Sequence, residues 1–131
     1  MKPHLLLIED DRWLADSYIH VLDEEFDIDS AVNGQDAMDL IDVNDYDVVI
    51  ADVMLERGLV IDLLHELQAY DDTARLPIIL CTTLAQQITL DDVKAYGVVA
   101  VLDKTTLTPK LLREAVEDSL ADGKWKMEDG K

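Results

Sequence analysis

The chain has 131 residues, a formal net charge of -18 and one cysteine. That length suits one domain with a single core, and one cysteine excludes an internal disulfide framework. The 29 Asp and Glu residues against 11 Lys and Arg argue against direct binding to nucleic acid or to an anionic membrane surface, since both would repel the chain.

The predicted elements begin with MKPHLLLIEDD, where only a short apolar run precedes three acids. This run is too short for a signal peptide or a membrane span, so we expect a cytoplasmic chain. Similar apolar runs predict further buried strands, and the alternation over 26–32 predicts a half-exposed edge strand. The runs cover residues 5–8, 48–51, 78–81 and 98–102. Cys81 ends one of them and is expected to be a buried hydrophobe rather than a reactive thiol.

Helical periodicity fills the intervals between these runs. Apolar residues recur at three- and four-residue spacing over 14–22, 37–41, 63–67, 93–96 and 111–120. Residues typical of helix ends lie where these helices should begin and end. Asp11 can cap the first, Thr89 with Asp92 resembles a capping box at the fourth, Gly97 can close that helix, and Thr108 can start the last.

Strands alternating with helices predict an α/β fold, with a parallel sheet covered on both faces. The right-handed crossover rule favours the doubly wound sandwich among the remaining topologies. We expect one domain over residues 3–120. Residues 121–131 are predicted to be a polar C-terminal tail or the stub of a linker.

Polar residues follow the predicted strands at the edge where such sheets bind ligands. They are Glu9 and Asp10 after the first strand, Asp52 after the third, Thr82 and Thr83 after the fourth, and Asp103 and Lys104 after the fifth. Three convergent carboxylates would raise one another's pKa unless a cation lies among them.

Oxygen ligands without a nearby His or Cys favour Mg2+ as that cation. The histidines His4, His20 and His65 lack ligand-like spacing and are expected to be surface or packing residues. A divalent ion beside one carboxylate, with a lysine and a hydroxyl opposite, is the arrangement that phosphoryl transfer to that carboxylate requires.

Four motifs carry a family resemblance. IEDD, IADVML, PIILCTT and VLDK end the first, third, fourth and fifth predicted strands, and together they resemble the receiver domain of two-component response regulators. The resemblance covers residues 3 to about 120. It implies a flavodoxin-like sheet of order 2-1-3-4-5 with five helices, and a signalling switch that assists its own phosphorylation and slow dephosphorylation rather than a metabolic enzyme.

The resemblance also implies a role for each matching residue. Asp52 would accept a phosphoryl group from a phosphohistidine on a sensor histidine kinase or phosphotransfer protein. Lys104 would pair with Asp52 and then with the phosphoryl group. Thr82 would hydrogen-bond a phosphoryl oxygen and move, shifting the fourth helix, the fifth strand and the fifth helix. A downstream protein target is the second expected partner.

A magnesium site is implied by the same resemblance. Asp10 and Asp52 would hold Mg2+ directly, together with the backbone carbonyl of Met54. Glu9 would act through the water shell of the ion.

Several positions depart from the family pattern. Glu56 and Val60 stand where the family usually has proline and glycine, and Val101 replaces an aromatic that swings inward on activation. Thr105 replaces a proline after Lys104, so we expect a trans peptide bond there.

Two alternatives come from these observations. A receiver-like module could signal by protein contacts without phosphorylation, whereas a flavodoxin-like electron carrier is disfavoured because IEDDRW replaces the phosphate loop.

Trp13 is either a contact for a kinase's helical surface or a lid over the core. The residues leave homodimer formation open, and the absence of a basic helix argues against direct nucleic-acid binding.

Overall fold

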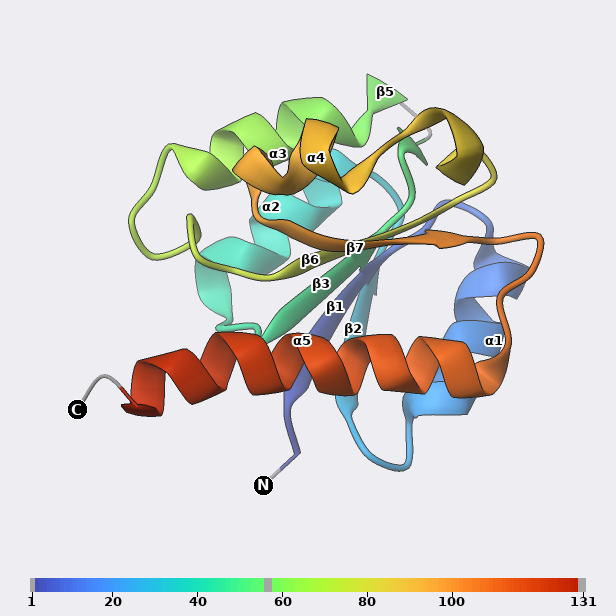
Figure 1. Ribbon diagram of the computed structural model, residues 1–131, viewed down its shortest axis with the longest axis horizontal. Coiled ribbons are helices and arrows are strands. Elements are labelled where there is room, and N and C mark those ends of the chain that lie inside the picture. The colour runs from blue at the N-terminus through green and yellow to red at the C-terminus, as the bar shows by residue number, and fades with distance from the viewer. Residues whose placement is uncertain (1, 56–57, 130–131) are drawn as a thin grey trace.

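A parallel sheet of five strands lies at the centre of the computed structural model, which describes residues 2–55 and 58–129. Its order is β2-β1-β3-β6-β7, as predicted (Figure 1). The strands are β1 (His4–Ile8), β2 (Asp27–Ala31), β3 (Val48–Ala51), β6 (Ile78–Thr82) and β7 (Val98–Asp103).

Burial explains the continuous apolar runs in the central strands. Every residue of β3 and β6 is buried, and β1 is buried from Leu5 onward, because helices cover both faces of the sheet. The edge strand β2 is only partly buried, in line with the predicted half-exposed strand. The other edge strand, β7, was predicted to be buried on both faces, and this prediction is wrong: only Val98 is buried, because β7 has a neighbouring strand on one side only. Cys81 lies in β6 and is buried, as predicted.

The helices form two layers around this sheet. Helices α1 (Arg12–Leu22) and α5 (Pro109–Asp129) cover one face, while α2 (Gly34–Val43), α3 (Val60–Gln68) and α4 (Leu90–Val93) cover the other (Figure 1). Short 3-10 turns, η1 (Ala85–Gln87) and η2 (Lys94–Tyr96), flank α4. Helix α5 continues through most of the segment predicted as a polar tail. No helix in the described part of the chain is long and apolar enough to cross a membrane.

The predicted helix signals at Asp11, Thr89, Gly97 and Thr108 are confirmed. Gly97 has a φ of 91°, in the left-handed region that favours glycine. A Cβ at this position would lie 3.2 Å from the carbonyl oxygen of Leu76. Glycine therefore allows the chain to turn closely from η2 into β7.

A small antiparallel ladder that the sequence did not predict follows β3. It pairs β4 (Met54–Leu55) with β5 (Gly58–Leu59). The amide of Val60 donates to the carbonyl of Val53 at 2.9 Å and closes the ladder onto α3. Residue 56, the predicted departure with a glutamate, lies outside the described residues.

Candidate functional site

The register of the sheet brings the predicted site residues to one edge. The amide of Asp52 donates to the carbonyl of Ile8 at 3.2 Å, so Asp52 lies next to Glu9, which directly follows the neighbouring strand β1. The amide of Lys104 donates to the carbonyl of Thr82 at 3.1 Å, which places these two side by side. All four residues follow or end strands at the carboxyl edge, where open parallel sheets bind ligands.

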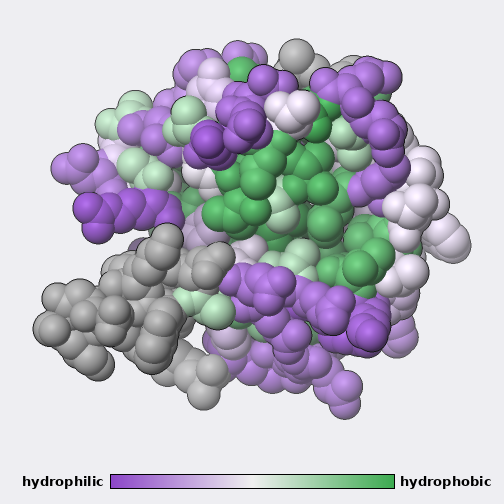
Figure 2. Space-filling model, in the orientation of Figure 1, coloured by the Kyte–Doolittle hydropathy of each residue, from purple (hydrophilic) through white to green (hydrophobic). Residues whose placement is uncertain are grey.

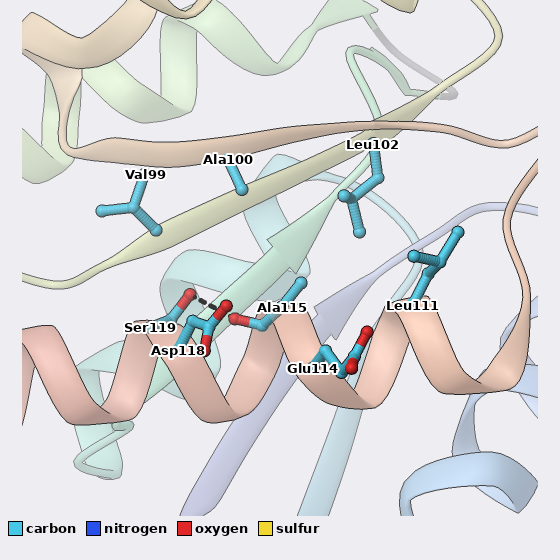
Figure 3. Close-up of a pocket in the computed structure, with 8 residues that line it drawn as sticks. All are labelled: Val99, Ala100, Leu102, Leu111, Glu114, Ala115, Asp118 and Ser119. Atoms are coloured by element: carbon cyan, nitrogen blue, oxygen red, sulfur yellow. Dashed lines mark hydrogen bonds between the residues drawn. The ribbon is translucent and has the colours of Figure 1, made fainter.

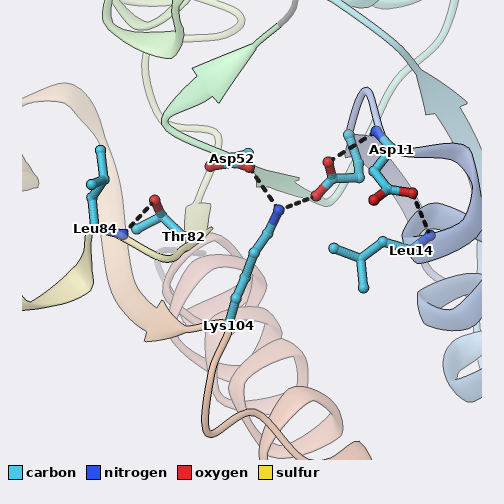
Figure 4. A network of polar contacts seen from close by, with 7 residues as sticks. Asp11, Leu14, Asp52, Thr82, Leu84 and Lys104 are labelled. Atoms are coloured by element: carbon cyan, nitrogen blue, oxygen red, sulfur yellow. Dashed lines mark hydrogen bonds and ion pairs between the residues drawn. The ribbon is translucent and has the colours of Figure 1, made fainter.

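Lys104 bridges two carboxylates across this edge (Figure 4). Its ammonium lies 2.6 Å from Asp52 Oδ2 and 2.5 Å from Glu9 Oε1. The side chains of Lys104 and Asp52 are each only 12% exposed, and Glu9 is buried. These ion pairs are therefore weakly screened by solvent, unlike pairs on an open surface.

Burial raises the pKa of Glu9 above its ordinary value, and the contact with Lys104 offsets this only in part. The neighbouring carboxyl group of Asp10 acts in the same direction as burial. Because the pKa of Glu9 is higher in the folded state than in the unfolded state, its ionisation costs stability at neutral pH. The positive charge of Lys104 reduces this cost.

Burial alone would lower the pKa of Lys104, but its hydrogen bonds to Asp52 and Glu9 outweigh that effect and raise the pKa above the ordinary 10.5. The stability that these contacts contribute is fully present below pH 10.5 and is lost only as the pH rises through the raised pKa. Lys104 is therefore a fixed cation at neutral pH.

Thr82 lies fully buried at the end of β6, beside the ion-paired group. Its Oγ1 accepts a hydrogen bond from the amide of Leu84 at 3.0 Å (Figure 4). A hydroxyl that accepts one bond still has a proton to donate. Thr82 can thus donate to a new oxygen at the site. Because the Leu84 amide is bonded to the same hydroxyl, a movement of Thr82 would also move the following loop.

The remaining predicted residues lie around this group. Asp10 is exposed, and Met54 opens β4 directly after Asp52 and Val53. Among the residues with described side chains, no three His, Cys, Asp or Glu residues form a metal-binding group. Trp13 is 80% exposed on the first turn of α1, which excludes the predicted alternative of a lid over the core.

The turn after β7 forms without the family's proline. The amide and hydroxyl of Thr105 both donate to Asp103 Oδ1, at 2.9 and 2.7 Å. No cis peptide bond occurs in the described residues, so the expected trans bond before Thr105 is confirmed. Val101 is partly buried and packs against the core cluster on the α2, α3 and α4 face, where Leu84 also packs.

The sequence did not predict that Lys104 contacts Glu9 as well as Asp52. Glu9 was expected to act through the water shell of a metal ion, and in the structure it is buried and ion-paired with Lys104. One sequence feature could have indicated the burial of Glu9. It directly follows a short apolar strand, β1, in which every residue after His4 is buried.

Comparison with known proteins identifies the family. The model of the response regulator receiver domain matches residues 5–117. The chain belongs to the receiver domain family. It is 31% identical over 98 residues to the probable transcriptional regulator ycf29 of Porphyra purpurea, covering 74% of this chain and 46% of that protein. It is 27% identical over 121 residues to the chemotaxis protein CheY of Halobacterium salinarum, covering 92% and 98% of the two chains.

Solved structures agree with the fold of this receiver domain. The signal receiver domain of a putative LuxO repressor protein from Vibrio parahaemolyticus superposes with a TM-score of 0.85, at 24% identity, over 100% of this chain and 99% of that one. A putative response regulator from Chloroflexus aurantiacus has a TM-score of 0.80 at 27% identity, over 92% and 99%. The chain is thus a CheY-like receiver domain of the signalling-switch family used in two-component systems.

Proposed function

We propose that this receiver domain accepts a phosphoryl group on Asp52 from the phosphohistidine of a sensor histidine kinase or phosphotransfer protein. The observation that carries the proposal is the bridge from Lys104 to Asp52 and the buried Glu9. In the transfer, a carboxylate oxygen of Asp52 bonds to phosphorus while the phosphorus–nitrogen bond breaks. The imidazole leaves with that electron pair and takes a proton from solvent.

The residues around Asp52 would have different roles in this transfer. Lys104 places a fixed positive charge where negative charge gathers on the phosphoryl oxygens. Thr82 has a hydroxyl proton to donate to one of those oxygens. Its bond to the Leu84 amide would carry the resulting movement into the loop after β6.

The donor set at this edge suits Mg2+, because carboxylate oxygens already share a cation there. Asp10, Asp52 and the Met54 carbonyl would hold the ion, and Glu9 would contact its water shell. When bound, Mg2+ supplies positive charge that offsets the charge on the transferring phosphoryl group. It remains for Lys104 and Thr82 to orient that group.

Phosphorylation of Asp52 is tested by incubating the chain with Mg2+ and acetyl phosphate and measuring its intact mass. We expect the wild-type chain to gain one phosphoryl group and Asp52→Asn to gain none, since an amide is not a nucleophile of this kind. Asp42→Asn, an exposed helical position with the same chemical change, serves as the control and should gain the group normally.

The same assay separates the receiver from a module that signals without phosphorylation. A wild-type chain with unchanged mass would reject the phosphoacceptor proposal and favour the interaction module. Equal phosphorylation of the wild-type chain and Asp52→Asn would assign the group to another residue.

A downstream protein would then bind on the surface over β7. Figure 2 shows an apolar area there, between α5 and the helices of the opposite layer. A groove of about 420 Å³ opens between β7 and α5, with Glu114 and Asp118 on its helical side (Figure 3). Val99 and Leu111 are 40% and 48% exposed beside it.

These charges favour one kind of occupant. Apolar side chains of a partner would enter the groove, and its Lys or Arg residues would pair with Glu114 and Asp118. A second copy of this chain would bring the same acids to the same rim and be repelled. We therefore propose a basic amphipathic segment of a downstream protein as the partner.

Leu111→Glu tests this surface with a labelled amphipathic peptide of leucine and lysine as the probe. We expect the variant to weaken binding about tenfold, because it puts a charge at the apolar mouth of the groove. Val43→Glu, at an exposed position on α2, adds the same charge and should bind like the wild type. Equal binding by both variants would refute the groove, and a dimer of the free chain in sedimentation would assign it to a second copy.

A further inference from the structure

The backbone around Lys104 is held on both sides. On the strand side, Asp103 pairs with Thr82 in the register of β6 and β7, and the Lys104 amide donates to the Thr82 carbonyl at 3.1 Å. On the other side, the Thr106 amide donates to the Asp103 carbonyl at 3.2 Å and closes a four-residue turn. Lys104 is the first central residue of this turn.

The side chain of Asp103 stabilises the same turn. Its Oδ1 accepts hydrogen bonds from both the amide and the hydroxyl of Thr105, at 2.9 and 2.7 Å. Bonds of this kind, from an aspartate side chain to the backbone two residues on, fix turns. A proline at position 105 would have neither donor. The restraint by Asp103 therefore depends on the threonine that this chain has after Lys104.

The carboxyl group of Asp103 is ionised at neutral pH. Hydrogen bonds from Thr105 and from the side chain of Gln86 lower its pKa. An ionised carboxylate accepts stronger hydrogen bonds than a neutral acceptor does. Gln86 belongs to η1, in the segment that follows Thr82, so Asp103 contacts this segment as well as the turn.

The position of the turn matters because the lysine side chain is long and flexible. Its ammonium lies 2.6 Å from Asp52 Oδ2 and 2.5 Å from Glu9 Oε1. A shift of the backbone by about 1 Å would lengthen these contacts, and a shift of that size at a reacting group can cost a large part of the rate. The contacts of the ammonium therefore require a fixed backbone at Lys104.

We propose that Asp103 is a positioning residue, whose carboxylate fixes the turn through Thr105 and thereby holds the Lys104 ammonium at Asp52. The inference rests on the proposed phosphorylation of Asp52 and deepens it, because it names a residue that orients the cation there. Asp103 acts through the backbone of Lys104 and does not need to touch the phosphoryl group.

The first test is the rate at which the full-length chain gains a phosphoryl group from saturating acetyl phosphate with Mg2+, followed by intact mass. We expect Asp103→Ala to lower this rate about tenfold, because the ammonium is displaced from the transferring group. Asp103→Asn removes the same charge but keeps an acceptor oxygen, so its rate should stay within about threefold of the wild type. Asp42→Ala, at an exposed position on α2, is the matched control and should react like the wild type.

Two outcomes of this assay would overturn the proposal. An unchanged rate in Asp103→Ala would show that the carboxylate does not position Lys104. Equal losses in Asp103→Ala and Asp103→Asn would assign the effect to the lost charge and not to the hydrogen bonds with Thr105.

A double-mutant cycle tests whether Asp103 acts through Thr105. Thr105→Val removes the hydroxyl and keeps the amide, so alone it should lower the rate by about threefold, a part of the effect of Asp103→Ala. Added to Asp103→Ala, it should cause almost no further loss, because its acceptor is already gone. Independent effects of the two substitutions would overturn this route. Thr105→Val also serves as the test variant if Asp103→Ala fails to fold.

NMR of the lysine ammonium groups measures the position of Lys104 without any phosphorylation. In Asp103→Ala, or in Thr105→Val, hydrogen exchange between the Lys104 ammonium and water should be at least about threefold faster than in the wild type. The ammonium of Lys94, which pairs with Asp91 on the surface, should be unaffected. An unchanged Lys104 signal would overturn the proposal. A wild-type chain that gains no phosphoryl group would instead reject the proposed function, and the NMR comparison would still decide whether Asp103 positions Lys104.

Discussion

Leu64→Ala is expected to lower the free energy of unfolding by about 3 to 4 kcal/mol, a large fraction of the stability of a single domain. Leu64 is fully buried on α3 and belongs to the core cluster that includes Val53 and Val60. Removing its side chain loses the burial of several methyl and methylene groups and leaves a cavity that the close-packed layer cannot fill.

The measurement is equilibrium unfolding in urea at fixed pH and salt, with the slope checked for two-state behaviour. Leu111→Ala is the matched control. It makes the same chemical change at a position that is 48% exposed, so its effect should stay within about 0.5 kcal/mol. Equal losses in the two variants would show that α3 contributes no more to the core than the exposed side of α5.

The sheet could be predicted because its central strands are buried on both faces. Their sequences are then unbroken apolar runs, as in Val48–Ala51. The similar run in β7 shows the limit of this signal, because that strand lies at the sheet edge and only Val98 in it is buried. The turns could be predicted where the reason is local. Asp11 caps a helix through its own side chain, and Gly97 adopts a backbone conformation that few other residues tolerate.

The β4–β5 ladder could not be predicted in the same way. Its residues, Met54–Leu55 and Gly58–Leu59, are too few for either periodicity to appear. The ladder is closed by a bond from the Val60 amide to the carbonyl of Val53, which depends on where α3 docks. Tertiary contacts therefore decide the shape of this loop.

The convergence of Asp52, Thr82 and Lys104 at one edge followed from topology, because all follow or end parallel strands. The contact between Lys104 and Glu9 did not follow. It joins residues 95 positions apart, and the choice of the ammonium between neighbouring acids depends on their burial. Glu9 is buried whereas Asp10 is exposed, a difference that no periodic pattern in IEDD reveals.

Salt should stabilise this chain strongly. Its 29 acidic residues exceed its 11 basic residues by 18, and among the described residues two of the three lysine ion pairs already use Lys104. Most of the acids therefore repel one another on the folded surface. The unfolded chain spreads the same charges farther apart, so screening favours the folded state.

We expect the midpoint of thermal unfolding to rise by about 10 °C between about 0.1 M and about 2 M KCl, because the screening length falls from about 10 Å to less than 3 Å. The measurement is circular dichroism with chelator present, so that binding of a divalent ion does not contribute. A midpoint that stays constant or falls would show that repulsion between the acids is not a major cost of folding.

A variant with fewer charges separates this effect from a general action of salt on apolar groups. Asp16→Asn, Asp42→Asn, Glu66→Gln and Glu117→Gln together neutralise four exposed helical acids. The variant should unfold at a higher temperature than the wild type in low salt and respond less to KCl, since less repulsion is left to screen. If its response to KCl equalled that of the wild type, salt would act on the apolar core instead. The same repulsion should make the loss of Lys104, which pairs with both Glu9 and Asp52, especially destabilising for the acids at the site.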